Sequence, residues 1–341
     1  MSKIGVLFGC FVFSLTLFFV NCSTKKDADS SEPSVAEIPI FSSLSLTTDI
    51  STAPKDSASD TIIAWLDANG GWGGGTMRVD FSNHLLVKKS TTSTLPIKND
   101  PSYVSPDCDD GLTTFPMPDG GAFEGETGYS CAGGGDCHLL VVDPANGKLY
   151  ESFQSNVVDD LGVSKLQSVC AIVWDINKTY GTNIRGDNCA SADASGLPLA
   201  ALLFTADEIA AGSINHAIRF LLPNNRIKAG VFVHPATHAG VPSGATDAPP
   251  LGARFRLKAS FDTSSLKPAA KIVAEAMKKY GMILVDAGSI ALTAASDTYT
   301  TRKWSEVDFN SVDLASLAVT DFEMIDAGTR YPLTYNCVRE P

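Results

Sequence analysis

The chain has 341 residues and a formal net charge of −12, from 26 Lys and Arg against 38 Asp and Glu. This acidic balance, with no basic cluster, argues against a nucleic-acid-binding protein and against an anionic membrane surface as a partner. Its 28 glycines and 18 prolines are scattered without an internal repeat, which indicates many turns.

The N-terminus has the features of an export signal. A positive start at Lys3 precedes an apolar run, Ile4–Val20, that is short for a membrane-spanning helix. The ending Phe-Val-Asn-Cys at Cys22 resembles a bacterial lipobox, in which the cysteine is lipidated and becomes the mature N-terminus. An ordinary cleaved signal, with Cys22 incidental, is the alternative. We favour the lipoprotein because the polar stretch Ser23–Ser34 is typical of a tether behind a lipid anchor.

These features predict three parts. Residues 1–21 are a lipoprotein signal peptide, residues 22–38 a flexible tether, and residues 39–341 one β-rich domain. We expect the protein at the bacterial outer membrane or cell surface, held by its lipid and monomeric.

Six cysteines follow the signal, and an even number in an exported chain indicates disulfides. Six cysteines allow 15 connectivities, and we expect the local pairs Cys131/Cys137 and Cys170/Cys189, with Cys108 and Cys337 as further disulfide candidates. No C-x-x-C spacing occurs, so zinc held by thiolates is not expected. We predict neither a metal nor a cofactor.

Short helices and a hairpin can be placed in chain order. Asp60–Ala68 predicts a helix with Asp60 as its N-cap. His138–Asp143 and Lys148–Gln154, around a turn ending in Asn-Gly, predict a β-hairpin. Thr205–Gly212 has a capping box and a terminal glycine, and Lys267–Tyr280 has an apolar stripe with cationic residues at its end; both predict helices.

Three strands are predicted in the second half of the chain: Ile214–Leu222, Ala253–Ser260 and an apolar run from Met282 that ends on Asp286. Strands outnumber helices. We therefore predict a mainly β, α+β fold with a β-sandwich-like core and one long amphipathic helix, Lys267–Tyr280, packed on it.

Strand alternation places Arg254, Arg256 and Lys258 on one face of Ala253–Ser260. Two interpretations stay open. The cations can keep an edge strand soluble, or they can line a cleft that binds carboxylate or sulfate groups through the arginines.

Candidate acid and base groups are few. His234 and His238 have the spacing of a helical metal pair, but Pro235 places them in a loop, which disfavours zinc and leaves His238 as an acid or base. Burial at the end of a strand would raise the pKa of Asp286, although the carboxyl can also simply bind its own turn. Asp193 is a candidate partner carboxylate.

Five motifs together resemble one largely uncharacterised family of secreted bacterial proteins, some of whose members are joined to carbohydrate-related modules. They are SADASGLPL (Ser191–Leu199), INHAIRF (Ile214–Phe220), VHPATH (Val233–His238), LGARFRLKASFD (Leu251–Asp262) and KKYGMILVDAGS (Lys278–Ser289). His234 replaces an expected tryptophan, and Ala287 replaces an asparagine. The resemblance implies an exported, carbohydrate-linked role by association.

The predicted function is that of a lipid-anchored envelope protein whose domain engages a polysaccharide or a host or envelope glycan. If it is an enzyme, we expect a polysaccharide hydrolase or lyase. The expected catalytic residues are Asp286, His238 and Asp193, and the expected substrate-binding residues, whose arginines would orient an acidic sugar, are His216, Arg219, Arg254, Arg256 and Lys258. The alternative is a non-catalytic adhesion or structural lipoprotein; a binder predicts exposed aromatic residues such as Trp72 or Trp174.

Overall fold

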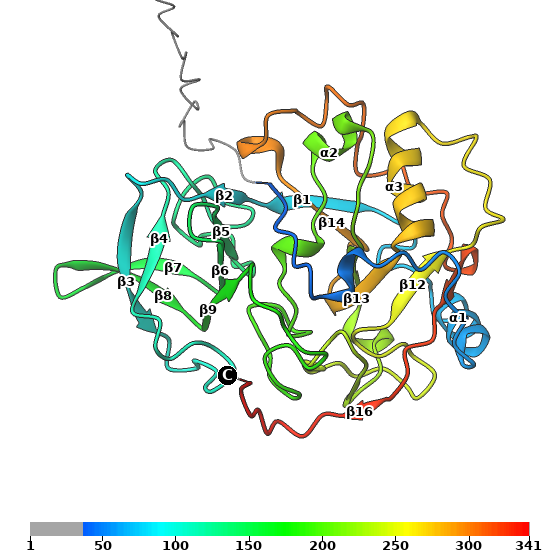
Figure 1. Ribbon diagram of the computed structural model, residues 1–341, viewed down its shortest axis with the longest axis horizontal. Coiled ribbons are helices and arrows are strands. Elements are labelled where there is room, and N and C mark those ends of the chain that lie inside the picture. Colours follow the sequence, from blue (N-terminus) through cyan, green and yellow to red (C-terminus); the bar gives the residue numbers. More distant parts are fainter. Residues whose placement is uncertain (1–36, 341) are drawn as a thin grey trace, which may run out of the picture. The chain divides into compact units, whose positions relative to one another are not determined.

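Strands dominate the computed structural model, which describes residues 37–340. The predicted signal sequence, Cys22 and most of the predicted tether lie outside these residues. The described residues belong to a single unit of internal contacts. The fold is α+β with a sheet core, as predicted from the sequence: among residues 37–340, sixteen strands form four sheets and three α-helices accompany them (Figure 1).

The largest sheet has six strands in the order β1-β14-β10-β13-β12-β15. The strands are β1 (Val79–Asn83), β10 (Ile218–Leu222), β12 (Arg254–Leu257), β13 (Met282–Ala287), β14 (Leu292–Ala295) and β15 (Phe322–Met324). β10 pairs in parallel with β13, and β1 with β14, while the other pairs are antiparallel. The central strand β13 begins with four buried apolar residues, as expected where both faces of a sheet are covered.

The α-helices accompany this sheet on the right of Figure 1. They are α1 (Ser59–Ala68), α2 (Ala206–Ala211) and α3 (Pro268–Lys279). The capping box predicted for α2 is confirmed. α3 occupies the segment predicted as helical, with Pro268 in its first turn and two lysines in its last. It has 12 residues, so the long helix of the prediction is not seen. α1 begins one residue before Asp60, whose carboxylate binds Lys55 instead of capping the helix.

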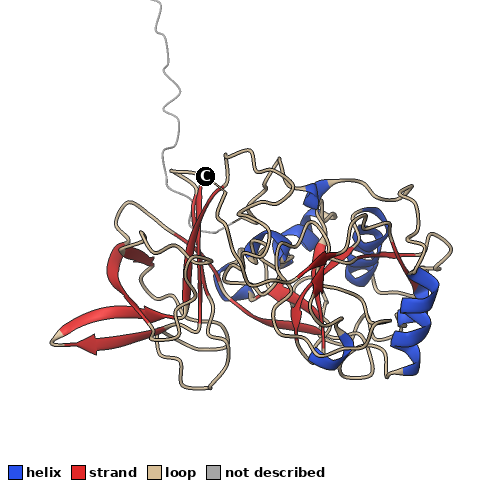
Figure 2. Ribbon diagram, turned by 90° about the horizontal axis from the view of Figure 1, so that it is seen from below, coloured by secondary structure: helices blue, strands red, loops and turns tan. Residues whose placement is uncertain are grey.

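Two four-stranded sheets lie on the other side of the molecule (Figure 2). The first contains β2 (Leu85–Val87), β5 (Leu139–Asp143), β6 (Lys148–Phe153) and β9 (Cys170–Asp175). The second contains β3 (Ser93–Asn99), β4 (Thr114–Met117), β7 (Asn156–Asp160) and β8 (Val163–Ser168). The predicted hairpin is confirmed as β5-β6.

The first of these sheets is buried on both faces because its residues alternate between two cores. Leu139 and Val141 on β5 pack with Phe115 and Leu166 from the second sheet. Leu140, the residue between them, packs into the main core of the molecule. The sandwich-like packing is therefore confined to these two small sheets, while the six-stranded sheet belongs to the main core.

A short sheet and five 3-10 turns complete the described chain. β11 (Val231–Phe232) pairs with β16 (Tyr331–Pro332). The turns are η1 (Ser45–Thr47), η2 (Ala200–Leu202), η3 (Asn224–Arg226), η4 (Asp297–Tyr299) and η5 (Val319–Asp321). Within residues 37–340, none of the helices has the length and apolar character needed to span a bilayer.

Three disulfides join cysteines within residues 37–340, one of them local and two across 62 and 148 positions of the chain. Cys131–Cys137 is present as predicted. The predicted pair Cys170/Cys189 is wrong, because Cys170 binds Cys108 and Cys189 binds Cys337. The last bond joins residues 148 positions apart and fixes the C-terminal segment to the loop that precedes Asp193.

Candidate functional site

A buried ion pair joins the largest sheet to the loop that follows Cys189. Arg219 on β10 and Asp193 in the loop are 3% and 1% exposed. Arg219 Nη1 lies 2.9 Å from Asp193 Oδ2. The other carboxylate oxygen, Oδ1, accepts hydrogen bonds from the backbone N–H and the hydroxyl of Ser195 at 3.1 and 2.6 Å. Charges this deep cost several kcal/mol each to remove from water, so the pairing is a precondition for their burial.

Asp286 reaches the same place from the neighbouring strand. β13 runs parallel to β10, and a shift in their register places Asp286 opposite Leu221. Its Oδ1 accepts a hydrogen bond from the Ala287 N–H at 2.7 Å. Burial and the charge of Asp193 raise the pKa of Asp286 to about 7, although Arg219 opposes them. The residue as a whole is half-buried, and its carboxyl is crowded by protein.

A second pair, Glu124 and His138, adjoins Arg219. His138 Nδ1 lies 2.7 Å from Glu124 Oε2, and His138 Nε2 lies 3.0 Å from the carbonyl oxygen of Ala192. Both ring nitrogens therefore face acceptors, which is the arrangement of a protonated imidazole. Burial by itself would lower the pKa of His138, but Glu124 outweighs it and raises this pKa to about 9.

The pKa of Glu124 moves in the opposite direction to that of Asp286. Burial would raise it, but the charge and hydrogen bond of His138, and then the charge of Arg219, lower the pKa of Glu124 to about 2. Its Oε1 accepts a hydrogen bond from Asn83 Nδ2 at 2.8 Å, and 17% of its side chain is exposed. The site thus holds one carboxyl that titrates near neutral pH and one that is ionised there.

Several buried polar atoms of this site have no hydrogen-bond partner among residues 37–340. They are Nε and Nη1 of Arg219, Oδ2 of Asp193 and Oδ1 of Asn83. The contact between Arg219 Nη1 and Asp193 is close but ionic, since its angles do not fit a hydrogen bond. An unsatisfied buried donor or acceptor costs about 1–3 kcal/mol. The nitrogens of Arg219 are donors and the oxygens of Asp193 and Asn83 are acceptors, so each of these buried atoms lacks the complementary partner that would offset its burial.

A fourth carboxyl lies behind the site. Glu151 on β6 accepts hydrogen bonds from the Ala200 N–H and from Trp174 Nε1, both at 2.8 Å. Burial raises the pKa of Glu151 to about 7, and the charge of Asp193 adds to the effect. Because Glu151 is fully buried, it acts on the site only through charge and packing.

The cations of β12 lie elsewhere. β12 is an interior strand, and the face that carries Arg254 and Arg256 is covered by the segment around residues 45–53. Arg254 donates to the carbonyl oxygens of residues 45, 48 and 280. Arg256 donates to those of residues 50 and 53 and to Glu323. Lys258 donates to the Thr320 carbonyl. The interpretation of this segment as a solvent-facing edge strand is wrong, because β12 lies between β13 and β15. The contacts described above occupy the cationic groups that were expected to bind substrate.

The two histidines predicted for the site, His216 and His238, form hydrogen bonds with residues of their own neighbourhoods. His216 lies between Glu208, at 3.0 Å, and the Ala217 carbonyl, and it is 1% exposed. His238 Nδ1 accepts a hydrogen bond from the Gly240 N–H, and burial lowers its pKa. Among the described residues, no hydrogen bond or ion pair links either histidine to Arg219 or Asp286.

The structure thus brings together Asp193, Arg219 and Asp286 of the predicted set. The site residues that sequence reasoning missed are Asn83, Glu124 and His138. His138 had a signal, since it is a polar residue at the start of the otherwise apolar strand LLVV. Glu124 lies in a Pro- and Gly-rich loop, where no periodicity points to its neighbours.

A cluster of metal-ligand types occurs at Glu126, Cys131 and Cys137. The two sulfurs are joined in a disulfide, so they cannot act as thiolate ligands. A scan against protein-family models, a search of curated proteins and a search of solved structures each found no match to this chain.

Proposed function

We propose that the protein is an exported, lipid-anchored enzyme that cleaves glycosidic bonds at the site formed by Asp286 and Glu124, a polysaccharide hydrolase. The observation that carries the proposal is the opposite tuning of two carboxyls around one buried arginine. Pairs of carboxyls whose surroundings separate their pKa values are the usual basis of acid and base assignments in such enzymes.

Asp286 is the proton donor in this mechanism. With a pKa of about 7, it still carries its proton in a large fraction of molecules at neutral pH and can give it to the oxygen of the leaving sugar. Asp193 does not need to touch substrate. It is a positioning residue, because its charge helps to keep the proton on Asp286.

Glu124 supplies the negative charge. Its carboxylate stays ionised because His138 and Arg219 stabilise it, so it can stabilise positive charge on the sugar ring or activate the attacking group. Arg219 is buried, so its charge acts on Glu124 and Asp286 from inside the protein.

The test is a glycan panel incubated with the purified protein and with Asp286→Asn and Glu124→Gln variants. We expect product from at least one glycan and a fall in kcat of about 10²–10⁴ in each variant, the usual contribution of a general acid or base. Glu275→Gln is the control, because that side chain is exposed on α3. Absence of product from every glycan would overturn the proposal.

A non-catalytic binder is the alternative, and the aromatic residues weigh against it. Trp72 is 1% exposed and Trp174 is not exposed at all. Both indoles donate hydrogen bonds inside the protein, to the Leu317 carbonyl and to Glu151. Neither can stack on a sugar.

The anchoring part of the proposal depends on Cys22 and has its own test. We expect incorporation of labelled fatty acid into the protein in its native host and loss of the label in a Cys22→Ala variant. Export of an unlabelled, shortened wild-type chain would show an ordinary signal peptide instead.

A further inference from the structure

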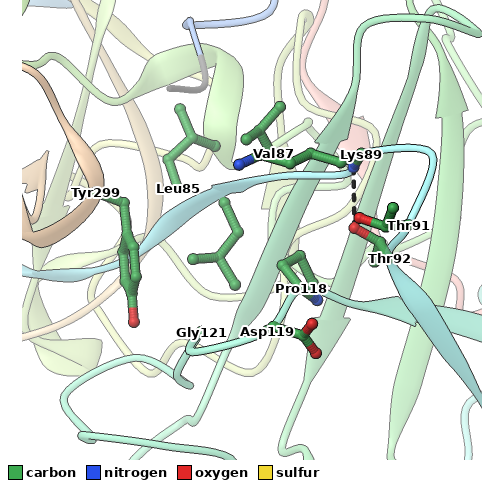
Figure 3. A pocket seen from close by; sticks show the side chains of 10 residues that line it. Leu85, Val87, Lys89, Thr91, Thr92, Pro118, Asp119, Gly121 and Tyr299 are labelled. Carbon is green, nitrogen blue, oxygen red and sulfur yellow. Dashed lines mark hydrogen bonds between the residues drawn. The ribbon is translucent and has the colours of Figure 1, made fainter. Parts of the chain in front are cut away.

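A small pocket opens at the edge of the first four-stranded sheet (Figure 3). Its volume is about 210 Å³, below the range of about 300–1,000 Å³ that is typical for a complete ligand of moderate size. Leu85 and Pro118 provide apolar surface, and Lys89, Asp119 and Tyr299 provide an amine, a carboxylate and an aromatic ring. The size and the mixed lining fit one unit of a longer ligand.

The pocket is built by segments that also hold the active site. Leu85 comes two residues after Asn83, and Gly121 comes three residues before Glu124. Tyr299 follows Ser296, whose N–H donates to the Asn83 carbonyl at 2.7 Å. Since an extended chain spans at most about 3.6 Å per residue, the Cα atom of Leu85 lies within about 7 Å of that of Asn83. The pocket therefore lies next to the segment that carries Asn83.

The wall formed by Tyr299 is held in place from two directions. Its hydroxyl donates to the Gly120 carbonyl at 2.8 Å. Its ring meets the His84 ring edge-on, with 5.3 Å between the centroids. In Figure 3, Tyr299 stands on one side of the pocket, and Lys89 and Thr92 stand on the other. The hydroxyl is thus occupied, and the ring is what Tyr299 offers to a ligand.

The opposite wall carries groups that can bind hydroxyls. The Lys89 ammonium and the Asp119 carboxylate are exposed, and neither forms an ion pair within residues 37–340. An apolar floor, a fixed ring and a rim of unpaired polar groups match a sugar unit, which has an apolar ring face and a hydroxyl edge.

The charges favour an uncharged sugar. In the pocket, one cation balances one carboxylate. In the active site, Arg219 and His138 balance Asp193 and Glu124. Neither place has the surplus of cations that recognition of a uronate or sulfated sugar requires.

We propose that this pocket is a binding subsite for a neutral sugar unit of the glycan that extends from the active site. The proposal rests on the proposed function for the identity of the neighbouring site, but it concerns binding and can be tested without turnover.

The test uses Asp286→Asn protein and calorimetric titration with neutral oligosaccharides of increasing length. In this background we expect Asp119→Asn and Lys89→Met each to weaken the binding of the longer oligosaccharides about tenfold, the value of one hydrogen bond to a charged group. The shortest should bind unchanged. Asp247→Asn and Lys271→Met are matched controls, because both side chains are exposed and form no ion pair within the described chain.

Three other results would contradict the proposed subsite. Equal binding by the pocket variants and their parent, tighter binding of acidic oligosaccharides, or no binding of any neutral oligosaccharide would overturn the subsite. Turnover by the unmodified protein is measured separately. Weaker binding in the pocket variants, together with no cleavage by the unmodified protein, would support the subsite and remove the proposed enzymatic activity.

Discussion

At the scale of single residues, neighbours a few ångströms away decide which carboxyl holds a proton. Glu124 has a protonated imidazole at 2.7 Å, and this contact keeps its pKa at about 2 despite burial. Asp286 is crowded by protein and has the like charge of Asp193 nearby, which together raise its pKa to about 7. The division of roles between two chemically similar groups is therefore a property of their surroundings.

A first prediction isolates the contribution of Asp193. In Asp193→Asn, the like charge disappears while Arg219 keeps its charge, so the pKa of Asp286 should fall. A proton donor is active only below its pKa, so the alkaline limb of the rate profile should move to lower pH, by about one unit. The measurement is kcat/KM against pH on the glycan found in the panel.

Ser195→Ala is the control for that prediction, because it removes one hydrogen bond to Asp193 but leaves the charge in place. The variants must be compared at a temperature where both are folded, since an unpaired buried Arg219 destabilises the protein by about 3–5 kcal/mol. An alkaline limb that stays in place in Asp193→Asn would show that Asp193 does not act on Asp286.

Part of this site could be predicted from the sequence. Asp193, Arg219 and Asp286 were recognisable because each carries a polar group into or beside an apolar strand or a tight loop. His138 left only the signal of a polar residue ahead of an apolar strand, and Asn83 and Glu124 left none, because the meeting of these three residues depends on a parallel pairing of β2 with β5 and on a loop path. Neither feature leaves a local pattern.

At the scale of elements, β12 shows what alternation can and cannot predict. The alternation of ARFRL correctly assigns Arg254 and Arg256 to one face. It cannot say what covers that face, and here the chain from residues 45 to 53 supplies backbone carbonyls to both guanidinium groups. The arginines therefore fasten an N-terminal segment to the sheet.

The second prediction follows from this fastening. Arg254→Met leaves three carbonyls without their donor, and it should lower the free energy of unfolding by about 3 kcal/mol, while Lys258→Met should change it by less than about 0.5 kcal/mol. Urea unfolding measures both. Glycan affinity should be unchanged in a folded Arg254→Met sample; weaker binding there would return Arg254 to the substrate-binding set.

Secondary structure was predictable where the signals were local. The β5-β6 hairpin and the capping box of α2 each depend on a few adjacent residues. The disulfides were not predictable in the same way. The entropy cost of closing a loop rises only with the logarithm of its length, so the separation of two cysteines in the sequence is a weak guide to their pairing. Cys189 accordingly bonds Cys337 across 148 positions and not the nearer Cys170.

At the scale of the whole molecule, the site lies where the sheets meet. Arg219 and Asp286 come from the six-stranded sheet, and His138 comes immediately before β5 of the first four-stranded sheet. Glu151, on β6 of that same sheet, lies behind them. The protein thus buries several titratable groups inside its main core, which couples the protonation of the site to the stability of the fold.

The last prediction is the resulting pH dependence of stability. Asp286 and Glu151 have raised pKa values of about 7, so the folded state binds their protons more tightly than the unfolded state does. Their contribution is complete below about pH 4 and is lost as the pH rises through 7. His138, with a pKa of about 9, adds a contribution that is lost between about pH 6.5 and 9. Glu124, with a pKa of about 2, opposes this on the acid side, where its contribution is lost as the pH falls below about 4.

Thermal unfolding should therefore show the highest Tm near pH 5 and a decline toward pH 9. In Asp286→Asn, the decline between pH 5 and 7 should be shallower, because that side chain no longer titrates. A Tm that stays level from pH 5 to 9, or the same slope in the variant, would mean that the buried carboxyls titrate as they do in water.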